Sequence, residues 1–254
     1  MSALLPTRIV EKPWGRTDLP PPFACDGRRV GEIWFEPPRA LESLLVKYLF
    51  TSERLSVQVH PPGPQGKDEC WFVVEAEPGA ELGLGFLEDV SPARLREAAL
   101  DGSIEQLLAW YPVEAGEFIY IPAGTVHAIG GGLTVIELQQ NSDITYRLYD
   151  YGRPRELHLD RGLAVAHCGR HDPGLRRKLP ASGAVTLASG PYFALSRVEG
   201  SPTGEACAPL LVVPLHGSVE IAGEPVQPGQ CGLADTPESL SVAPDAQCLL
   251  AWAC

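Results

Sequence analysis

Turn-forming residues interrupt this chain at short intervals along its whole length. Glycine and proline account for 26 and 25 of the 254 residues, so about one position in five favours a turn. Breaks this frequent leave room for many short strands and loops but little room for long helices. Because 44% of the residues are hydrophobic, the chain can bury a core in one large β domain or in two smaller ones.

An acidic charge balance and scattered cysteines narrow the range of partners and compartments. The formal net charge of -12 repels phosphate backbones, so we expect no nucleic-acid partner. A small anion can still bind where arginines and lysines cluster locally. We find no uncharged apolar run near 18 residues, and therefore expect neither a membrane span nor a signal peptide.

The seven cysteines stand singly, without a Cys-x-x-Cys pair, which favours reduced thiols in a cytoplasmic protein.

Alternating apolar and polar residues predict strands in the first part of the chain. The segments concerned are LESLLVKYLF (41–50), LSVQVH (55–60), ECWFVVEA (69–76) and much of 113–150. In LSVQVH, the apolar side chains point to one face, while Ser56, Gln58 and His60 point to the other. Ser91-Pro92 is typical of a helix start, and Asp101-Gly102 of a break. We therefore expect two short helices between about 92 and 110.

The order of these segments predicts two β modules. The first covers residues 1–167 and contains the helices as an insertion. Residues 168–184 are polar, include RHDPGLRRK and are predicted to form a linker. Short β segments separated by tight turns return over residues 185–254 and form a smaller second module. The glycines of ELGLGF (81–86) do not indicate a dinucleotide site, because a third glycine and a βαβ context are missing.

Four polar side chains of the first module can converge on one point. Gln58 and His60 leave the same face of a strand, and Glu69 opens the next strand after a short loop. His127 follows a Pro-Ala-Gly turn that can bring it into the same space. One amide oxygen, two imidazoles and one carboxylate suit a divalent ion such as zinc. Taken alone, Gln58, His60 and Glu69 more often have a surface or hydrogen-bonding role, and His127 after its turn is the least ordinary of the four, so the hypothesis depends on the set.

The segments that carry these residues resemble those of a known family. They occur in the family's order and span most of the first 155 residues: KPWG (12–15), GEIW (31–34), LLVKYLFTSERLSVQVHP (44–61), GKDECWFVV (66–74), FIYIPAGTVHAI (118–129) and ELQQNSDITYRLYDYGR (137–153). Together they resemble the type I mannose-6-phosphate isomerases of the short bacterial kind. KPWG continues here as RTDL, which departs from the family's pattern.

The resemblance implies a fold, an activity and a set of site residues. The fold is mainly β, with two cupin-like β-barrel or jelly-roll modules and a short helical insertion in the first. The second module has one histidine, His216, and no ligand set, so its role is structural. The activity is the metal-dependent interconversion of mannose 6-phosphate, a small phosphosugar, and fructose 6-phosphate. The family's ligands to one divalent ion, most often Zn²⁺, fall on Gln58, His60, Glu69 and His127, its active-site arginine falls on Arg147, and its lysine and glutamate near the sugar fall on Lys67 and Glu137.

This isomerisation leaves several assignments open. Moving the carbonyl from C1 to C2 passes through an enediolate, whose charge a divalent cation and an arginine can stabilise. Either Glu137 or a zinc-bound hydroxide can remove the C–H proton, while Lys67 polarises an oxygen or relays a proton. The phosphate can be held by Lys47, Arg147 or Arg153. Alternatively, Arg147 pairs with one of two nearby acids, Asp143 or Asp150.

Two other functions are compatible with the same motifs. A cupin that binds metal and sugar without turnover would retain the four ligands and leave Lys67, Glu137 and Arg147 idle. An iron-dependent cupin oxygenase would have further histidines where this set has a glutamine. Chelator-sensitive turnover of mannose 6-phosphate separates the isomerase from the non-catalytic binding protein.

Overall fold

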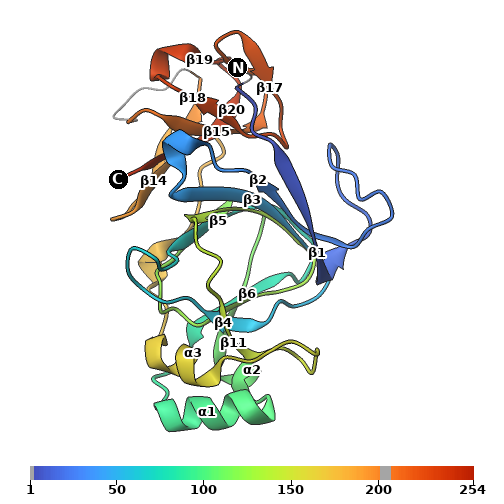
Figure 1. Ribbon diagram of the computed structural model, residues 1–254, viewed down its shortest axis with the longest axis vertical. Coiled ribbons are helices and arrows are strands. Elements are labelled where there is room, and N and C mark those ends of the chain that lie inside the picture. Colours follow the sequence, from blue (N-terminus) through green and yellow to red (C-terminus); the bar gives the residue numbers. More distant parts are fainter. Residues whose placement is uncertain (1–2, 201–206) are drawn as a thin grey trace.

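The computed structural model describes residues 3–200 and 207–254, and strands dominate it (Figure 1). The strands of the first part are β1 (Thr7–Arg16), β2 (Val30–Phe35), β3 (Leu44–Thr51), β4 (Val57–Val59), β5 (Glu69–Ala76), β6 (Glu81–Phe86), β7 (Leu108–Pro112), β8 (Glu117–Ile121), β9 (His127–Ile129), β10 (Leu133–Gln140), β11 (Tyr146–Tyr149) and β12 (Arg176–Lys178). Those of the second part are β13 (Val185–Ser189), β14 (Phe193–Glu199), β15 (Leu210–His216), β16 (Val219–Ile221), β17 (Glu224–Val226), β18 (Gly232–Ala234), β19 (Leu240–Val242) and β20 (Gln247–Ala253). The α-helices are α1 (Pro92–Asp101), α2 (Ile104–Leu107) and α3 (Leu159–Val165). None of the helices within the described ranges is long and apolar enough to cross a membrane.

The described strands form two β-sandwiches, one above the other in Figure 1. The first pairs a seven-stranded sheet, β1-β2-β3-β10-β5-β8-β12, with a five-stranded sheet, β11-β4-β9-β6-β7. The second pairs the sheet β13-β14-β20-β15-β18 with the sheet β17-β16-β19. The helices gather at the far end of the first sandwich (Figure 1). This arrangement confirms the predicted mainly β fold of two cupin-like modules with a helical insertion in the first.

The seven-stranded sheet is buried on both faces. One face packs on the second module, where Val46, Phe72 and Ile136 share a core with Leu195 and Leu249. The opposite face belongs to the interior of the first sandwich. All eight residues of β3 and all eight of β10 are therefore buried. Because Val46, Ile136 and Leu138 pack in the core shared with the second module, the charged residues next to them, Lys47 and Glu137, point into the first sandwich.

The helical insertion begins where it was predicted but ends earlier than the predicted residue 110. Ser91 accepts a hydrogen bond from the Arg94 amide and caps α1, and Gly102 ends that helix with a φ of 83°. After one turn of α2, residues 108–110 belong to strand β7, where Leu108 pairs with Phe86 of β6. The helical prediction for these residues was wrong, because pairing with a sheet edge outweighs a weak local helical pattern.

Two predicted strands also differ in how closely they match the structure. ECWFVVEA coincides with β5. LSVQVH contains the shorter strand β4, in which Val57 and Val59 are fully buried. These two valines pack with Leu95 and Ala98 of α1 on the helix-covered face of their sheet, so Gln58 between them faces the interior of the sandwich.

The segment between the two modules has structure of its own. Within residues 168–184, β12 pairs with β8 and forms an edge of the seven-stranded sheet. At the other end of the chain, Leu4 forms a β-bridge with Gly232 of the second module. The division at residues 167 and 185 stays a prediction, and the contacts between the modules suggest one cooperative unit.

Truncation of Leu195 tests the shared core between the modules. Leu195 is 3% exposed and belongs to that core, whereas Leu100 on α1 is 66% exposed. We expect Leu195→Ala to lower the free energy of unfolding by about 2–5 kcal/mol and Leu100→Ala to change it by less than about 0.5 kcal/mol. Urea unfolding followed by circular dichroism measures both. Equal effects of the two variants would contradict the shared core.

Candidate metal centre

Strand registers place the predicted site residues in two rows inside the first sandwich. Glu137 of β10 lies between Lys47 of β3 and Trp71 of β5 in the seven-stranded sheet. Gln58 of β4 lies between His127 of β9 and Arg147 of β11 in the five-stranded sheet. The edge of the Trp71 ring meets His127, with ring centroids 5.5 Å apart, so the two rows face each other. Antiparallel pairing thereby joins residues that lie far apart in the sequence.

His60, Glu69 and His127 form a compact cluster of possible metal ligands. One ligand atom from each lies within 4.8 Å of the others. Nε2 of His60 is 3.5 Å from Glu69 Oε2, and Nε2 of His127 is 3.3 Å from Oε1. The Nδ1 atoms lie 2.9 Å from the carbonyl oxygens of Ile144 and Thr125. Each Nδ1 must therefore carry the proton that it donates, which leaves both Nε2 atoms as acceptors, with Lys67 Nζ at 3.3 Å from that of His60 and Gln58 Nε2 at 3.2 Å from that of His127.

The electrostatics of this cluster suit a bound cation. Burial lowers the pKa of His60 well below its usual value, with Lys67 contributing, and lowers that of His127 to about 4. Both rings are therefore neutral near pH 7. Burial and the charge of Glu137 raise the pKa of Glu69 to about 7, against the opposing effect of Lys67. Lys67 Nζ lies 2.6 Å from Oε2 of Glu69, whereas Oε1 has no hydrogen-bond donor among the described residues. A buried carboxylate with one oxygen lacking a donor, beside two neutral imidazoles, fits a divalent metal ion.

Gln58 reaches the same point from β4. Its Nε2 atom lies 3.2 Å from Nε2 of His127, and its Oε1 accepts a hydrogen bond from Ser56 Oγ at 3.1 Å. Amide oxygen and nitrogen exchange by a simple flip, which would direct the oxygen at the cluster. Gln58 thus adjoins the cluster of His60, Glu69 and His127 through its contact with His127.

Two lysines and Glu137 extend the cluster across the seven-stranded sheet. Lys67 Nζ lies 2.6 Å from Glu69 Oε2 and 3.4 Å from Glu137 Oε1, while Lys47 Nζ lies 2.9 Å from Glu137 Oε1. The Trp71 indole donates to Glu137 Oε2 at 3.0 Å. Burial opposes ionisation of Glu137, but Lys47 and Lys67 outweigh it and lower its pKa to about 2. Burial likewise opposes the charge of Lys67, but Glu137 and Glu69 raise its pKa.

A cavity of about 580 Å³ lies against this cluster. Its lining includes Gln58, Lys67, Glu137 and Arg147, so the predicted catalytic residues share one space with a predicted ligand. On a protein with a net charge of -12, the lining is locally cationic. It contains four carboxylates and seven basic residues, the latter being Arg8, Lys12, Lys47, Lys67, Arg147, Arg155 and Arg161.

Arg147 is oriented by backbone and not by an acid. Its Nη1 donates to the carbonyl oxygen of Glu156 at 3.0 Å. Neither of the acids considered from sequence, Asp143 and Asp150, forms an ion pair with it among the described residues. Asp150 is occupied by Arg155 at 2.5 Å and by a second arginine, Arg153, at 3.1 Å. The guanidinium of Arg147 therefore faces the cavity without a bound carboxylate.

The structure separates the candidate phosphate-binding residues. Lys47 and Arg147 line the cavity, whereas Arg153 is absent from its lining and pairs with Glu53 and Asp150. Arg155 and Arg161 line the cavity but were missed by sequence reasoning. The signal was present in RPRELHLDR (153–161), a locally basic stretch that follows the TYRLYD motif.

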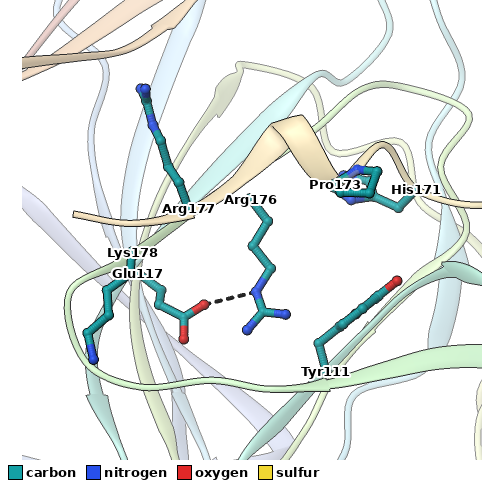
Figure 2. Close-up of a pocket in the computed structure, with 7 residues that line it drawn as sticks. All are labelled: Tyr111, Glu117, His171, Pro173, Arg176, Arg177 and Lys178. Carbon is teal, nitrogen blue, oxygen red and sulfur yellow. Dashed lines mark hydrogen bonds and ion pairs between the residues drawn. The ribbon is translucent and has the colours of Figure 1, made fainter.

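A second cavity of about 310 Å³ lies beside β12 (Figure 2). Figure 2 shows Arg176 extended toward Glu117, with Arg177 directed away from the space between them. Arg176 Nε lies 2.9 Å from Glu117 Oε2, and the guanidinium lies 5.1 Å from the centre of the Tyr111 ring. Lys178 is paired with Glu114. Because its lining includes none of the predicted site residues, this cavity is a weaker candidate for chemistry than the first.

Comparisons with known proteins point to one family. A mannose-6-phosphate isomerase from Streptococcus mutans is 39% identical over 200 residues, which cover 72% of this chain and 63% of that protein. The protein named probable mannose-6-phosphate isomerase GmuF from Bacillus subtilis is 33% identical over 219 residues, which cover 76% of this chain and 68% of that protein. The chain thus spans less than two thirds of the S. mutans relative's length. No family model matches the chain.

Solved structures show the same fold. The mannose 6-phosphate isomerase of Bacillus subtilis superposes with a TM-score of 0.82 at 23% identity, covering 98% of each chain. A zinc-bound mannose 6-phosphate isomerase superposes with a TM-score of 0.75 at 14% identity, again covering 98% of each chain. Sequence identity over two thirds of a relative, together with the shared fold, leads to one conclusion: this chain belongs to the mannose-6-phosphate isomerase family.

Proposed function

We propose that this protein is a zinc-dependent isomerase that interconverts mannose 6-phosphate and fructose 6-phosphate. The observation that carries the proposal is the buried cluster of His60, Glu69 and His127 beside a cationic cavity. Membership of the family and the zinc in a solved relative's structure support the metal and the substrate. In this proposal the three residues and Gln58 hold one Zn²⁺.

The proposed chemistry divides between the metal and the residues that face the sugar. A divalent cation held by His60, Glu69, His127 and Gln58 would supply a Lewis acid next to the bound sugar. Lys67, kept protonated by Glu69 and Glu137, donates a hydrogen bond from Nζ to the oxygen on which enediolate charge develops. Arg147, on the opposite sheet, adds a second positively charged side chain to that of Lys67. Its hydrogen bond to the Glu156 carbonyl holds the guanidinium in place.

In this proposal Glu137 holds the two lysines and does not remove the C–H proton. Its Oε1 contacts Lys47 and Lys67, and its Oε2 accepts from Trp71. A carboxylate with a pKa near 2 is a weak base, since a general base works best when its pKa lies near the working pH.

The phosphate group of the substrate needs cations away from the metal. We place it near Arg155 and Arg161, which line the same cavity and belong to the segment that follows β11. The local excess of basic residues would attract a dianionic phosphosugar to an otherwise acidic protein. We also propose a cytoplasmic location, which the seven unpaired cysteines support.

Removal of the metal should abolish turnover reversibly. After dialysis against a strong chelator, we expect conversion of mannose 6-phosphate, measured in a coupled assay, to fall to background and to return on addition of zinc. A zinc-free preparation with full activity would refute the proposed role of the metal. A zinc-loaded protein without turnover would favour a non-catalytic metal- and sugar-binding protein.

Replacement of His127 should weaken metal binding. His127→Ala removes a ligand, so we expect the zinc affinity to fall by at least about the 10–100-fold that loss of an outer partner causes. Elemental analysis after dialysis and competition with a chromophoric chelator measure the change. The matched control is His216→Ala, which removes an exposed histidine of the second module. A His127→Ala protein with full zinc content would refute the ligand assignment.

Replacement of Arg147 should separate catalysis from metal binding. Because Arg147 lines the cavity and is not one of the proposed ligands, we expect Arg147→Ala to retain zinc. Its kcat/KM should fall about 10²–10³-fold, as for the loss of one donor to a developing oxyanion. Arg94→Ala on the exposed face of α1 is the control. Near-normal kinetics of Arg147→Ala would count against the assigned role.

A further inference from the structure

Asp68 stands between two residues of the site and has a different environment from both. Lys67 and Glu69 on either side contact the buried cluster, whereas Asp68 lines a separate cavity of about 340 Å³ that includes residues of the second module. Its side chain is nevertheless 8% exposed. A carboxylate this deeply buried needs donors, and the identity of those donors indicates its role.

The carboxylate of Asp68 ties two other segments to the start of β5. Oδ1 accepts a hydrogen bond from the backbone amide of Ala123 at 2.9 Å, and Oδ2 accepts one from the Tyr120 hydroxyl at 2.6 Å. Ala123 belongs to the turn that leads into β9 and His127. The next amide of this turn, that of Gly124, donates to the carbonyl of His60 at 2.8 Å. Two consecutive amides of this turn, those of Ala123 and Gly124, thus tie it to the segment that carries Glu69 and to the segment that carries His60.

The backbone of Asp68 is held as firmly as its side chain. Its amide donates to Gln140 Oε1 at 2.8 Å, and its carbonyl accepts from the Gln140 amide at 3.1 Å. Gln140 ends β10, the strand that carries Glu137. These bonds fix the position of Asp68 relative to the seven-stranded sheet, so the carboxylate is a fixed anchor for the turn.

Tyr120 is itself held by the second module. Its ring lies 5.8 Å from that of Phe193 on β14, measured between centroids. A Cβ atom built on Gly190 would lie only 2.7 Å from the Tyr120 hydroxyl oxygen, so the loop between β13 and β14 closes tightly over it. Burial and the hydrogen bond to Asp68 raise the pKa of Tyr120, and the phenol stays a donor.

We propose that Asp68 is a positioning residue, which fixes the distance between Glu69 and His127 by anchoring the turn at Ala123, with Tyr120 as its support from the module boundary. The inference rests on the proposed metal site. In metal centres, residues that orient the ligands from outside contribute to affinity because they hold the ligands in place before binding.

Zinc affinity of four variants tests this role. Asp68→Ala removes both acceptors, Asp68→Asn retains an acceptor for Ala123 and a polar partner for the tyrosine, and Tyr120→Phe removes one donor. Thr51→Val is the matched control, because Thr51 is fully buried and its hydroxyl makes hydrogen bonds outside the site, to the carbonyls of Gly130 and Leu133 and from the Leu133 amide. Competition with a chromophoric chelator gives the zinc affinity of each purified protein, and thermal unfolding of the metal-free forms is measured in parallel.

We expect Asp68→Ala to bind zinc about 10–100-fold more weakly than the wild type, Tyr120→Phe to lose less, and Asp68→Asn to recover most of the affinity. Thr51→Val should unfold at a lower temperature yet bind zinc as tightly as the wild type. Wild-type zinc affinity in Asp68→Ala, with only its unfolding temperature lowered, would overturn the proposal. If Asp68→Ala does not fold, weaker binding by Tyr120→Phe than by Asp68→Asn supports the proposal, and equal binding overturns it.

The wild-type protein separates this inference from the function on which it rests. If the wild type neither binds zinc nor converts mannose 6-phosphate, the proposed function fails. If the wild type does both and the Asp68 variants bind zinc equally well, the function stands and only the positioning role fails.

Discussion

Ionised groups are costly to bury in a β-sandwich unless each meets an opposite charge or several hydrogen-bond donors, and this constraint organises the structure. Lys47, Glu137, Lys67 and Glu69 alternate in sign along a line of contacts across the seven-stranded sheet. Removing ions from water costs several kcal/mol each, so an unpaired member would destabilise the fold strongly. At the Glu69 end the line meets two neutral histidines. A cation is the group that completes the series there.

The line of charges depends on strand register. Glu137 lies opposite both Lys47 and Trp71 because β10 is hydrogen-bonded to β3 on one side and to β5 on the other. Gln58 lies opposite both His127 and Arg147 for the same reason in the facing sheet. A shift of one residue in any of these pairings would turn the polar side chains to the opposite face. The geometry of the site is therefore a property of the sheets, and the connecting turns only fix its ends.

The sequence predicted the parts of this arrangement that follow from period and local chemistry. The alternation of LSVQVH gives the direction of Gln58, and the Pro-Ala-Gly turn marks where His127 enters. The family resemblance then gathered these residues and Glu69 into one site. What could not be predicted depends on contacts between distant segments. Examples are the early end of the helical insertion at residue 107, where β6 pairs with the chain that follows, and the pairing of β12 with β8 inside a segment expected to be a linker.

The same limit applies to individual side chains. Arg147 was equally compatible with an acidic partner, and only the fold shows that Asp150 is taken by Arg153 and Arg155. Asp68 gave no signal at all, because its two donors come from residues more than fifty positions away. Sequence patterns report which face a residue takes on its own strand. They do not report what occupies the space beyond that face.

The two-sided burial of the seven-stranded sheet has a consequence for how this chain can change over time. Along β10, Glu137 belongs to the buried charged cluster, while its neighbours Ile136 and Leu138 pack against the second module. Neighbouring codons of one strand are thus under unrelated selective pressures, one from the charged cluster and one from docking. Sequence drift in either module is restrained by the other, so we expect the smaller module to persist in evolution although none of its described residues belongs to the cluster of possible metal ligands.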